Sequence, residues 1–321
     1  MRHLLTVLLT LLLAACQTSD REGYIPAETT DSTTVVRPYG VGLNLVIHAD
    51  SLLLQEDRPM HWSEGVAETS DTLWVQTGDH IVVAAITVIP EDSIDSIWVK
   101  VARDQQTMGW THECDFLDAV VPDDPISRFI LFFATHYRPW CLAVSALTLI
   151  LLLTGMSKGK RFPVIHFADI PSVYPTLLTV SLVLATVLFS HLSSVSPQAW
   201  QAFYFHPTLN PLSQPPLVRT FLCTLWAVIL LATAVIDDAA KLLRPGQAII
   251  YLLLLLGVCA MLLLFFSSVA PKPFGVSFAV AYTLFAAIRY WRHARPRYLC
   301  GNCGHHLHQK GRCPYCGAIN D

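Results

Sequence analysis

Hydrophobic residues form long uninterrupted segments between residues 139 and 293. No Lys, Arg, Asp or Glu lies between Arg138 and Lys158, and none occurs from Ile170 to Val218. An α-helix needs about 20 apolar residues to cross the hydrocarbon core of a bilayer. The pattern therefore predicts a bundle of five transmembrane helices. They are placed at about 140–156, 177–195, 217–236, 247–266 and 274–291.

Shorter hydrophobic runs with a different period precede these segments, between residues 40 and 121. Leu43, Leu45 and Ile47 stand at every second position, which is typical of a half-buried β-strand. Further strands are expected at Ile81–Ile89, Ile97–Ala102 and Met108–His112. Short strands at close spacing predict a small β-barrel.

Residues 122–138 are predicted to form a helix between the barrel and the first span. Asp124 suits the N-cap of this helix, and Pro125 suits its first turn. Phe129, Phe132 and Phe133 follow at helical spacing, so we expect the helix to lie at the outer membrane interface. The alternative is a short packed helix.

Composition and charge indicate that the two halves of the chain lie in different environments. Hydrophobic residues make up 53% of the 321 residues and charged residues only 14%, against about 25% in soluble domains. This excludes an ordinary soluble enzyme and a disordered protein. Residues 17–138 hold 7 Lys/Arg and 20 Asp/Glu, whereas residues 139–321 hold 13 and 4. An acidic half therefore precedes a basic, apolar one.

The N-terminus has the pattern of a signal peptide, residues 1–16. A basic start precedes a 12-residue apolar run, which ends in Leu13-Ala14-Ala15-Cys16. This ending resembles the lipobox of bacterial lipoproteins, and the resemblance implies lipidation of Cys16. The alternative is an uncleaved signal anchor in which Cys16 is incidental. Either interpretation places the polar linker 17–39 outside the cytoplasm.

Two strands of the expected barrel carry a family motif. Trp98-Val99-Lys100-Val101 leads through a polar hairpin into Gly109-Trp110-Thr111. This resembles the last two strands of bacterial SH3-like domains, with Thr111 in place of the usual aliphatic residue. The resemblance covers about 80 residues, 40–121, and implies binding of a peptide or of cell-wall material. Trp98 and Trp110 are candidate ligand-binding residues, and core packing is the alternative.

The distribution of Lys and Arg predicts the orientation of the spans, because positive residues favour cytoplasmic loops. Nine lie on the side of the C-terminus and three on the other. The nine are Lys158, Lys160, Arg161, Lys241, Arg244, Arg289, Arg292, Arg295 and Arg297, and the three are Arg138, Arg219 and Lys272. We therefore expect a multi-pass protein of the bacterial inner membrane, with the barrel periplasmic and the C-terminus cytoplasmic.

The uncharged loop at 196–216 is expected outside the membrane and is rich in aromatic residues and proline. Trp200 and His206 make it a candidate lid or ligand-contacting segment, and an interfacial turn is the alternative. The sequence shows none of the common hydrolase, metalloprotease or phosphate-binding motifs, so no catalytic residue is assigned.

The C-terminal tail, 297–321, contains two Cys-x-x-Cys pairs: Cys300 with Cys303, and Cys313 with Cys316. Glycine follows each pair and permits the sharp turn that brings both thiols toward one point. Four thiolates at this spacing are typical of a tetrahedral Zn²⁺ site. The tail closely resembles a short zinc ribbon. Replacement of one Cys ligand by His305, His306 or His308 stays open.

Together these features predict a membrane-anchored binding or sensing adaptor. Its partners would be the lipid bilayer, a cell-wall or peptide ligand outside, and a cytoplasmic protein at the ribbon. Nucleic acid is not an expected partner, because the ribbon offers only Lys310 and Arg312 and no aromatic stripe. The alternative function is a transporter component or a lipid-modifying enzyme that uses the 196–216 loop.

Overall fold

The computed structural model describes residues 37–56, 72–90, 92, 94–157, 172–294, 298–304, 306–307, 311–312 and 316–320. The predicted signal peptide with Cys16, nearly all of the linker 17–39, and Cys313 lie outside the described residues. The chain divides into two compact units. The β unit contains the described residues up to Thr135 together with Gln198–Leu209, and the helical unit contains His136–Pro197 and the residues from Asn210 onward.

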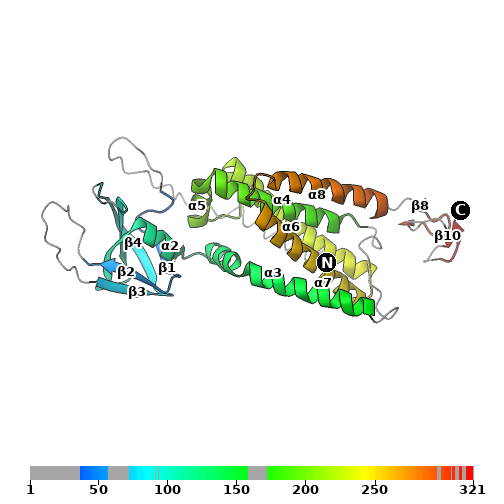
Figure 1. Cartoon of the computed structure of the whole chain (residues 1–321), viewed down its shortest axis with the longest axis horizontal. Helices are drawn as coiled ribbons and strands as arrows, with labels where there is room; N and C mark the ends of the chain where they lie inside the picture. Colours follow the sequence, from blue (N-terminus) through cyan, green and yellow to red (C-terminus); the bar gives the residue numbers. More distant parts are fainter. Residues whose placement is uncertain are drawn as a thin grey trace. The chain divides into compact units, whose positions relative to one another are not determined.

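A curled antiparallel sheet forms the β unit (Figure 1). Seven strands among the described residues are ordered β3–β2–β6–β5–β4–β1–β7. They are β1 (Asn44–Ile47), β2 (Ser51–Gln55), β3 (Thr72–Gln76), β4 (His80–Val88), β5 (Ile97–Ala102), β6 (Met108–His112) and β7 (Val120–Pro122). A short helix, α2 (Glu113–Ala119), links β6 to β7.

Alternation of side chains explains the core of this sheet. Leu45, Leu54 and Val99 are fully buried, whereas their chain neighbours point to the other face. The strands expected near residues 43–47, 81–89, 97–102 and 108–112 are confirmed as β1, β4, β5 and β6. Strands β2, β3 and β7 and helix α2 were not anticipated. The curled sheet forms a half-barrel. Strands β3 and β7 are its two edge strands.

Part of the 196–216 loop belongs to the β unit. Helix α5 (Pro197–Phe205) ends in Phe205, which is 5% exposed and joins the hydrophobic core of the sheet. The ring of Phe205 lies 5.9 Å from that of Tyr39, which in turn lies 5.3 Å from Phe116. The buried hydroxyl of Ser127 donates a hydrogen bond of 2.7 Å to the carbonyl of Tyr204. This segment is therefore a structural part of the unit.

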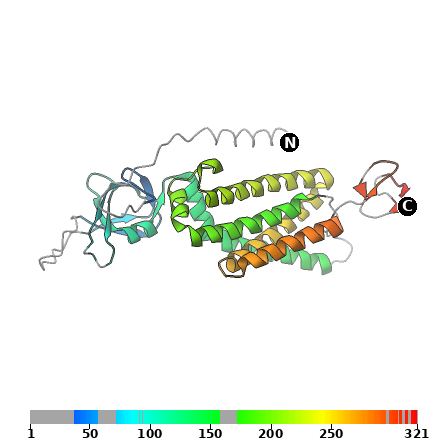
Figure 2. The ribbon, with the colours of Figure 1, turned by 90° about the horizontal axis from the view of Figure 1, so that it is seen from above.

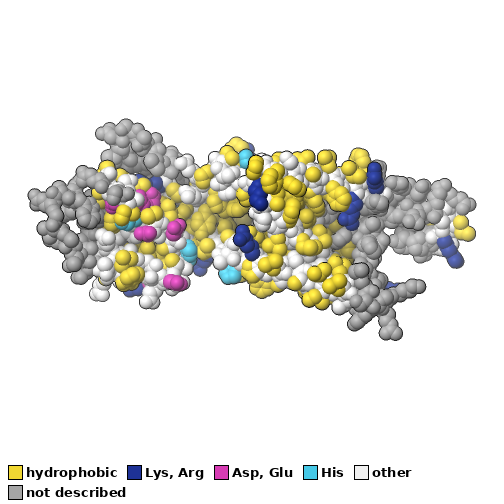
Figure 3. All heavy atoms as spheres, in the orientation of Figure 1, with side chains coloured by type: hydrophobic (Ala, Val, Ile, Leu, Met, Phe, Trp, Pro, Cys, Tyr) yellow, Lys and Arg dark blue, Asp and Glu magenta, His cyan; other side chains and the backbone are white. Residues whose placement is uncertain are grey.

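Long apolar helices make up the helical unit (Figure 2). They are α3 (Pro125–Ser157), whose first residues belong to the β unit, α4 (Tyr174–Val195), α6 (Pro216–Leu242), α7 (Pro245–Val269) and α8 (Gly275–Arg289). A 3-10 turn, η2 (Pro211–Ser213), precedes α6, and a π-helical turn, η3 (Tyr290–Ala294), extends α8. Hydrophobic side chains make up much of the visible face of these helices, with a few Lys and Arg among them (Figure 3).

Four helices within the described residues are long and apolar enough to cross a membrane. They are Pro125–Thr154 within α3, then α4, α6 and α7. Each overlaps one of the first four predicted spans, so the chain has the character of a membrane protein. The fifth predicted span, 274–291, coincides with α8 and η3, but α8 itself has only 15 residues.

The predicted interfacial helix 122–138 and the first span are not separate elements. Residues 125–157 form one helix, α3, with Pro139 inside it. A proline removes one backbone hydrogen bond from a helix interior. Prolines are nevertheless tolerated in membrane helices, because neighbouring groups satisfy the freed carbonyl. No glycine or capping residue ends the helix between Tyr137 and Trp140, so it continues through the proline.

Helix α4 holds the helical unit together, since α6, α7 and α8 all pack against it. Val183 and Val187 of α4 contact Phe266 of α7 and Ala279 of α8. At the other end of α4, the hydroxyl of Ser172 donates a 2.7 Å hydrogen bond to Asp238 of α6. The neighbouring Asp237 pairs with Lys241 one turn later on the same helix.

Candidate metal centre

Two very short hairpins organise the C-terminal tail. Strand β8 (Tyr298–Leu299) pairs antiparallel with β9 (His306–Leu307), and β10 (Gly311–Arg312) pairs with β11 (Ile319–Asn320). In the sequence, one Cys-x-x-Cys pair lies between the two strands of each hairpin. Cys300 and Cys303 therefore lie in the connection between β8 and β9.

Three of the four cysteines of the tail converge. The sulfur atoms of Cys300, Cys303 and Cys316 all lie within 4.8 Å of one another. Cys300 and Cys316, from different hairpins, are 3.6 Å apart. A disulfide would require about 2.05 Å. Four sulfurs at about 2.3 Å from a tetrahedral metal ion lie about 3.8 Å apart. The observed separation matches metal coordination and not a disulfide.

The turns around the thiols depend on glycine. The backbone N–H of Gly304 donates a 2.9 Å hydrogen bond to the carbonyl of Cys300, which closes the first turn. Gly304 has φ +69° and Gly317 has φ +74°, a left-handed conformation that a side chain disfavours. The glycine after each Cys-x-x-Cys pair therefore adopts the same left-handed conformation.

The first turn also favours the thiolate form of Cys300. The backbone N–H of Cys303, followed by that of Asn302, lowers the pKa of the Cys300 thiol to about 6. Because only the thiolate binds metal well, this turn is suited to a metal ligand. Cys300 is also 2% exposed, which protects its sulfur from solvent.

Asn320 connects the two hairpins, and sequence reasoning missed it. Its amide nitrogen lies 3.4 Å from the Cys300 sulfur, and its amide oxygen accepts a 2.9 Å hydrogen bond from the backbone of Gly301. Outer-shell groups of this kind orient metal ligands. Asn320 lies four residues after the last cysteine, and this spacing does not mark it as part of a metal site. Its contacts with Gly301 and Cys300 place it beside the first hairpin.

These three thiols can hold a metal ion. Soft sulfur donors select Zn²⁺, Cu⁺ or iron–sulfur chemistry over hard cations. Cys313, the predicted fourth ligand, lies outside the described residues. Ala318 packs against Cys300 and adds an apolar side to the cluster.

The two candidate ligand-binding tryptophans of the sheet are buried. Trp98 is 5% and Trp110 is 6% exposed, and both pack against Ile89. The indole N–H of Trp98 donates a 3.0 Å hydrogen bond to Asp92. The amino group of Lys100 lies 5.9 Å above the ring of Trp110. This environment favours the alternative of core packing.

The two candidate residues of the 196–216 loop have different surroundings. Trp200 is half-buried on α5, and its ring lies 5.6 Å from that of the buried Phe203. His206 is exposed directly after α5.

No family model matches the chain, and neither a curated protein nor a solved structure matches it.

Proposed function

We propose that the protein is a membrane-anchored binding or sensing adaptor. The β unit, an SH3-like domain in this proposal, engages an extracytoplasmic ligand. The C-terminal tail is a cytoplasmic zinc ribbon that engages a protein partner. The observation that carries the proposal is the convergence of Cys300, Cys303 and Cys316 from two hairpins at the end of an apolar helical unit.

Zinc is the metal that the donor set supports best. Cys313 completes a Cys₄ site in the proposal, and such a closed tetrahedral site is structural. The described strands of the tail have only two residues each. Burial in so small a fold cannot offset the entropy of ordering, about 1–2 kcal/mol per residue. Zinc binding, worth about 10–16 kcal/mol in comparable sites, can do so.

Five spans are proposed, in an inner membrane, with the β unit outside and the tail in the cytoplasm. The position of Phe205 in the core of the sheet supports this arrangement, because it requires the α4–α6 connection to lie on the same side as the β unit. Alternating passes of α3, α4, α6 and α7 satisfy that requirement. Helix α8 and η3, 15 and 5 residues long, make the fifth pass. Lipidation of Cys16 is part of the proposal.

Metal analysis of the full-length protein, purified in detergent, tests the ribbon. We expect one zinc per chain, replaceable by Co²⁺ with the intense visible bands of tetrahedral thiolate coordination. Cys303→Ser and Cys316→Ser should lose the metal, whereas Cys223→Ser, which changes an exposed thiol on α6, should keep it. A chain without zinc, or unchanged metal content in Cys303→Ser, would refute the ribbon.

Capture experiments test the adaptor role. Cytoplasmic proteins retained by the wild-type chain in detergent should be lost with Cys303→Ser and kept with Cys223→Ser. Equal retention by all three chains would show that the tail is not the partner-binding element.

A further inference from the structure

The outer face of the paired strands β2 and β3 carries large exposed hydrophobic side chains. Alternation along these strands buries Leu52, Leu54 and Val75 and turns their neighbours outward. Trp74 on β3 is 58% exposed, and its cross-strand partner Leu53 is 40% exposed. Isolated exposed leucines need no explanation, but an exposed tryptophan is the residue type most enriched at binding hot spots.

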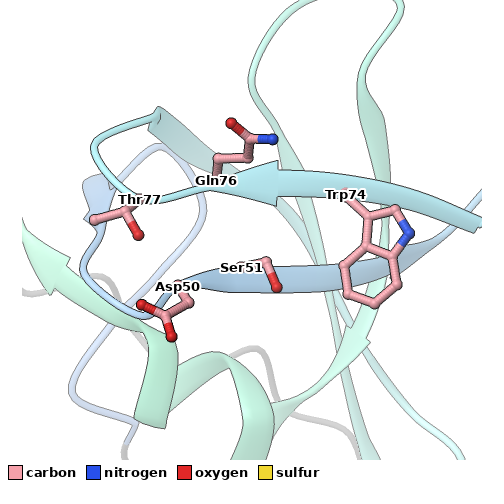
Figure 4. Close-up of a pocket in the computed structure, with 5 residues that line it drawn as sticks. All are labelled: Asp50, Ser51, Trp74, Gln76 and Thr77. Atoms are coloured by element: carbon pink, nitrogen blue, oxygen red, sulfur yellow. The ribbon is translucent and has the colours of Figure 1, made fainter.

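Polar side chains lie to one side of this tryptophan, along strands β2 and β3 (Figure 4). Together they line an open depression of ≈ 360 Å³. Its lining consists of Asp50, Ser51, Trp74, Gln76 and Thr77. They provide a carboxylate, two hydroxyls and an amide beside one large aromatic ring, and this lining has no Lys or Arg.

Two hydrogen bonds join the chain segments at the open end of strands β2 and β3. The hydroxyl of Thr77 donates a 2.5 Å hydrogen bond to the carbonyl of Ala49, and its backbone N–H donates to the carbonyl of Asp50 at 3.3 Å. Ser51 and Gln76 face each other in the register of the two strands. These bonds tie the backbone beside the depression, which limits the ordering cost of binding a ligand.

We propose that this depression is a binding site for neutral oligosaccharides. The apolar C–H face of a sugar ring can stack on the Trp74 indole. The ring hydroxyls can then donate to Asp50 and exchange hydrogen bonds with Ser51, Gln76 and Thr77. A lining with a carboxylate and no cation disfavours phosphorylated or carboxylated ligands.

An extended peptide is the weaker occupant. A peptide that joined the edge strand β3 would pair in the plane of the sheet, through backbone groups. The indole of Trp74 instead projects from the face of the hairpin, where strand side chains point. The proposal names the ligand class for the binding role proposed above and rests on that role.

Saturation-transfer NMR and calorimetry on the full-length chain test the site. The protein is placed in phosphatidylcholine nanodiscs, because alkyl glycoside detergents carry competing sugars. Chitotetraose, cellotetraose and maltotetraose are the probes. We expect at least one to bind, with the strongest saturation at protons on one ring face. Trp74→Ala should weaken binding at least about tenfold, whereas Trp74→Phe should keep part of it.

Two further variants separate the site from a folding defect. Ser51→Arg leaves the indole in place but fills the depression, and it should also weaken binding. Ile94→Ala, which changes a 78% exposed residue outside the depression, should bind as wild type does. Binding of none of the three oligosaccharides, or binding unaffected by both Trp74→Ala and Ser51→Arg, overturns the proposal. Zinc content and partner capture do not depend on Trp74, so they decide the proposed function separately.

Discussion

The Asp92 carboxylate contacts two aromatic side chains of the β unit, Trp98 and His112. One of its carboxylate oxygens accepts a hydrogen bond of 3.0 Å from the indole N–H of Trp98. The same oxygen lies 3.1 Å from Nε2 of the His112 imidazole, within hydrogen-bond distance. The other accepts the backbone N–H of Ile94 at 3.0 Å. The rings of Trp98 and His112 lie 4.0 Å apart. One carboxylate thus joins the β4–β5 connection to strands β5 and β6.

These bonds make the stability of the β unit dependent on pH. The backbone N–H of Ile94, with smaller effects of His112 and Trp98, holds the pKa of Asp92 below its usual value. A depressed pKa gives stability that is complete above the unfolded value of about 3.9 and is lost as pH falls through the folded pKa.

The thermal unfolding midpoint, followed by near-ultraviolet circular dichroism of the full chain, should therefore fall between pH 5 and pH 3. Asp92→Asn should lower the midpoint at pH 5 and show a smaller further fall at pH 3. Identical pH dependence in the two proteins would contradict this role for Asp92.

At the scale of elements, α5 contributes one anchoring side chain to the β unit. Phe205 packs in the sheet core, with its ring 5.9 Å from that of Tyr39. Phe205→Ala should destabilise the β unit by about 3–5 kcal/mol, because it removes a buried aromatic ring and leaves a cavity. Thermal unfolding and limited proteolysis of the full chain measure this effect. The adjacent exposed residue provides the control, and His206→Ala should leave both measurements unchanged.

Helices α3 and α7 meet at a glycine. A methyl group on Gly257 would lie 2.6 Å from both the Cβ and the Cγ2 of Thr148. Gly257→Ala should therefore overpack this crossing and cost about 1–3 kcal/mol. Gly246→Ala in the same helix meets no atom within 4 Å and should be harmless. Unfolding in mixed micelles gives both values, and Thr148→Gly should rescue Gly257→Ala. Without rescue, the contact with Thr148 is not the cause.

At the scale of the whole molecule, membrane topology is the decisive prediction. Phe205 in the β-unit core requires residues 198–209 and the β unit to share one side of the membrane. Alkaline phosphatase fused after residue 123 or after residue 208 should be active, and a fusion after Asp321 should be inactive. The Lys and Arg distribution predicts the same result independently. Activity of the fusion after Asp321 would show that α8 does not complete a fifth pass.

Local signals were enough to predict much of the architecture. Runs of apolar residues predicted five spans, and four of them coincide with helices long and apolar enough to cross a membrane. Alternation predicted β1, β4, β5 and β6. Both patterns depend on which residues lie one to four positions apart, so they can be read along the chain. The spacing of the cysteines likewise predicted that Cys300, Cys303 and Cys316 would converge.

Contacts between segments far apart in the chain could be identified only from the tertiary structure. Sequence could not choose between core and surface for Trp98 and Trp110, because burial depends on the strands that cover them. It gave no reason to place Phe205 in the sheet, to pair Asn320 with Cys300, or to single out Trp74. Each of these depends on the register and packing of segments far apart in the chain, where small differences in burial and hydrogen bonding decide the outcome.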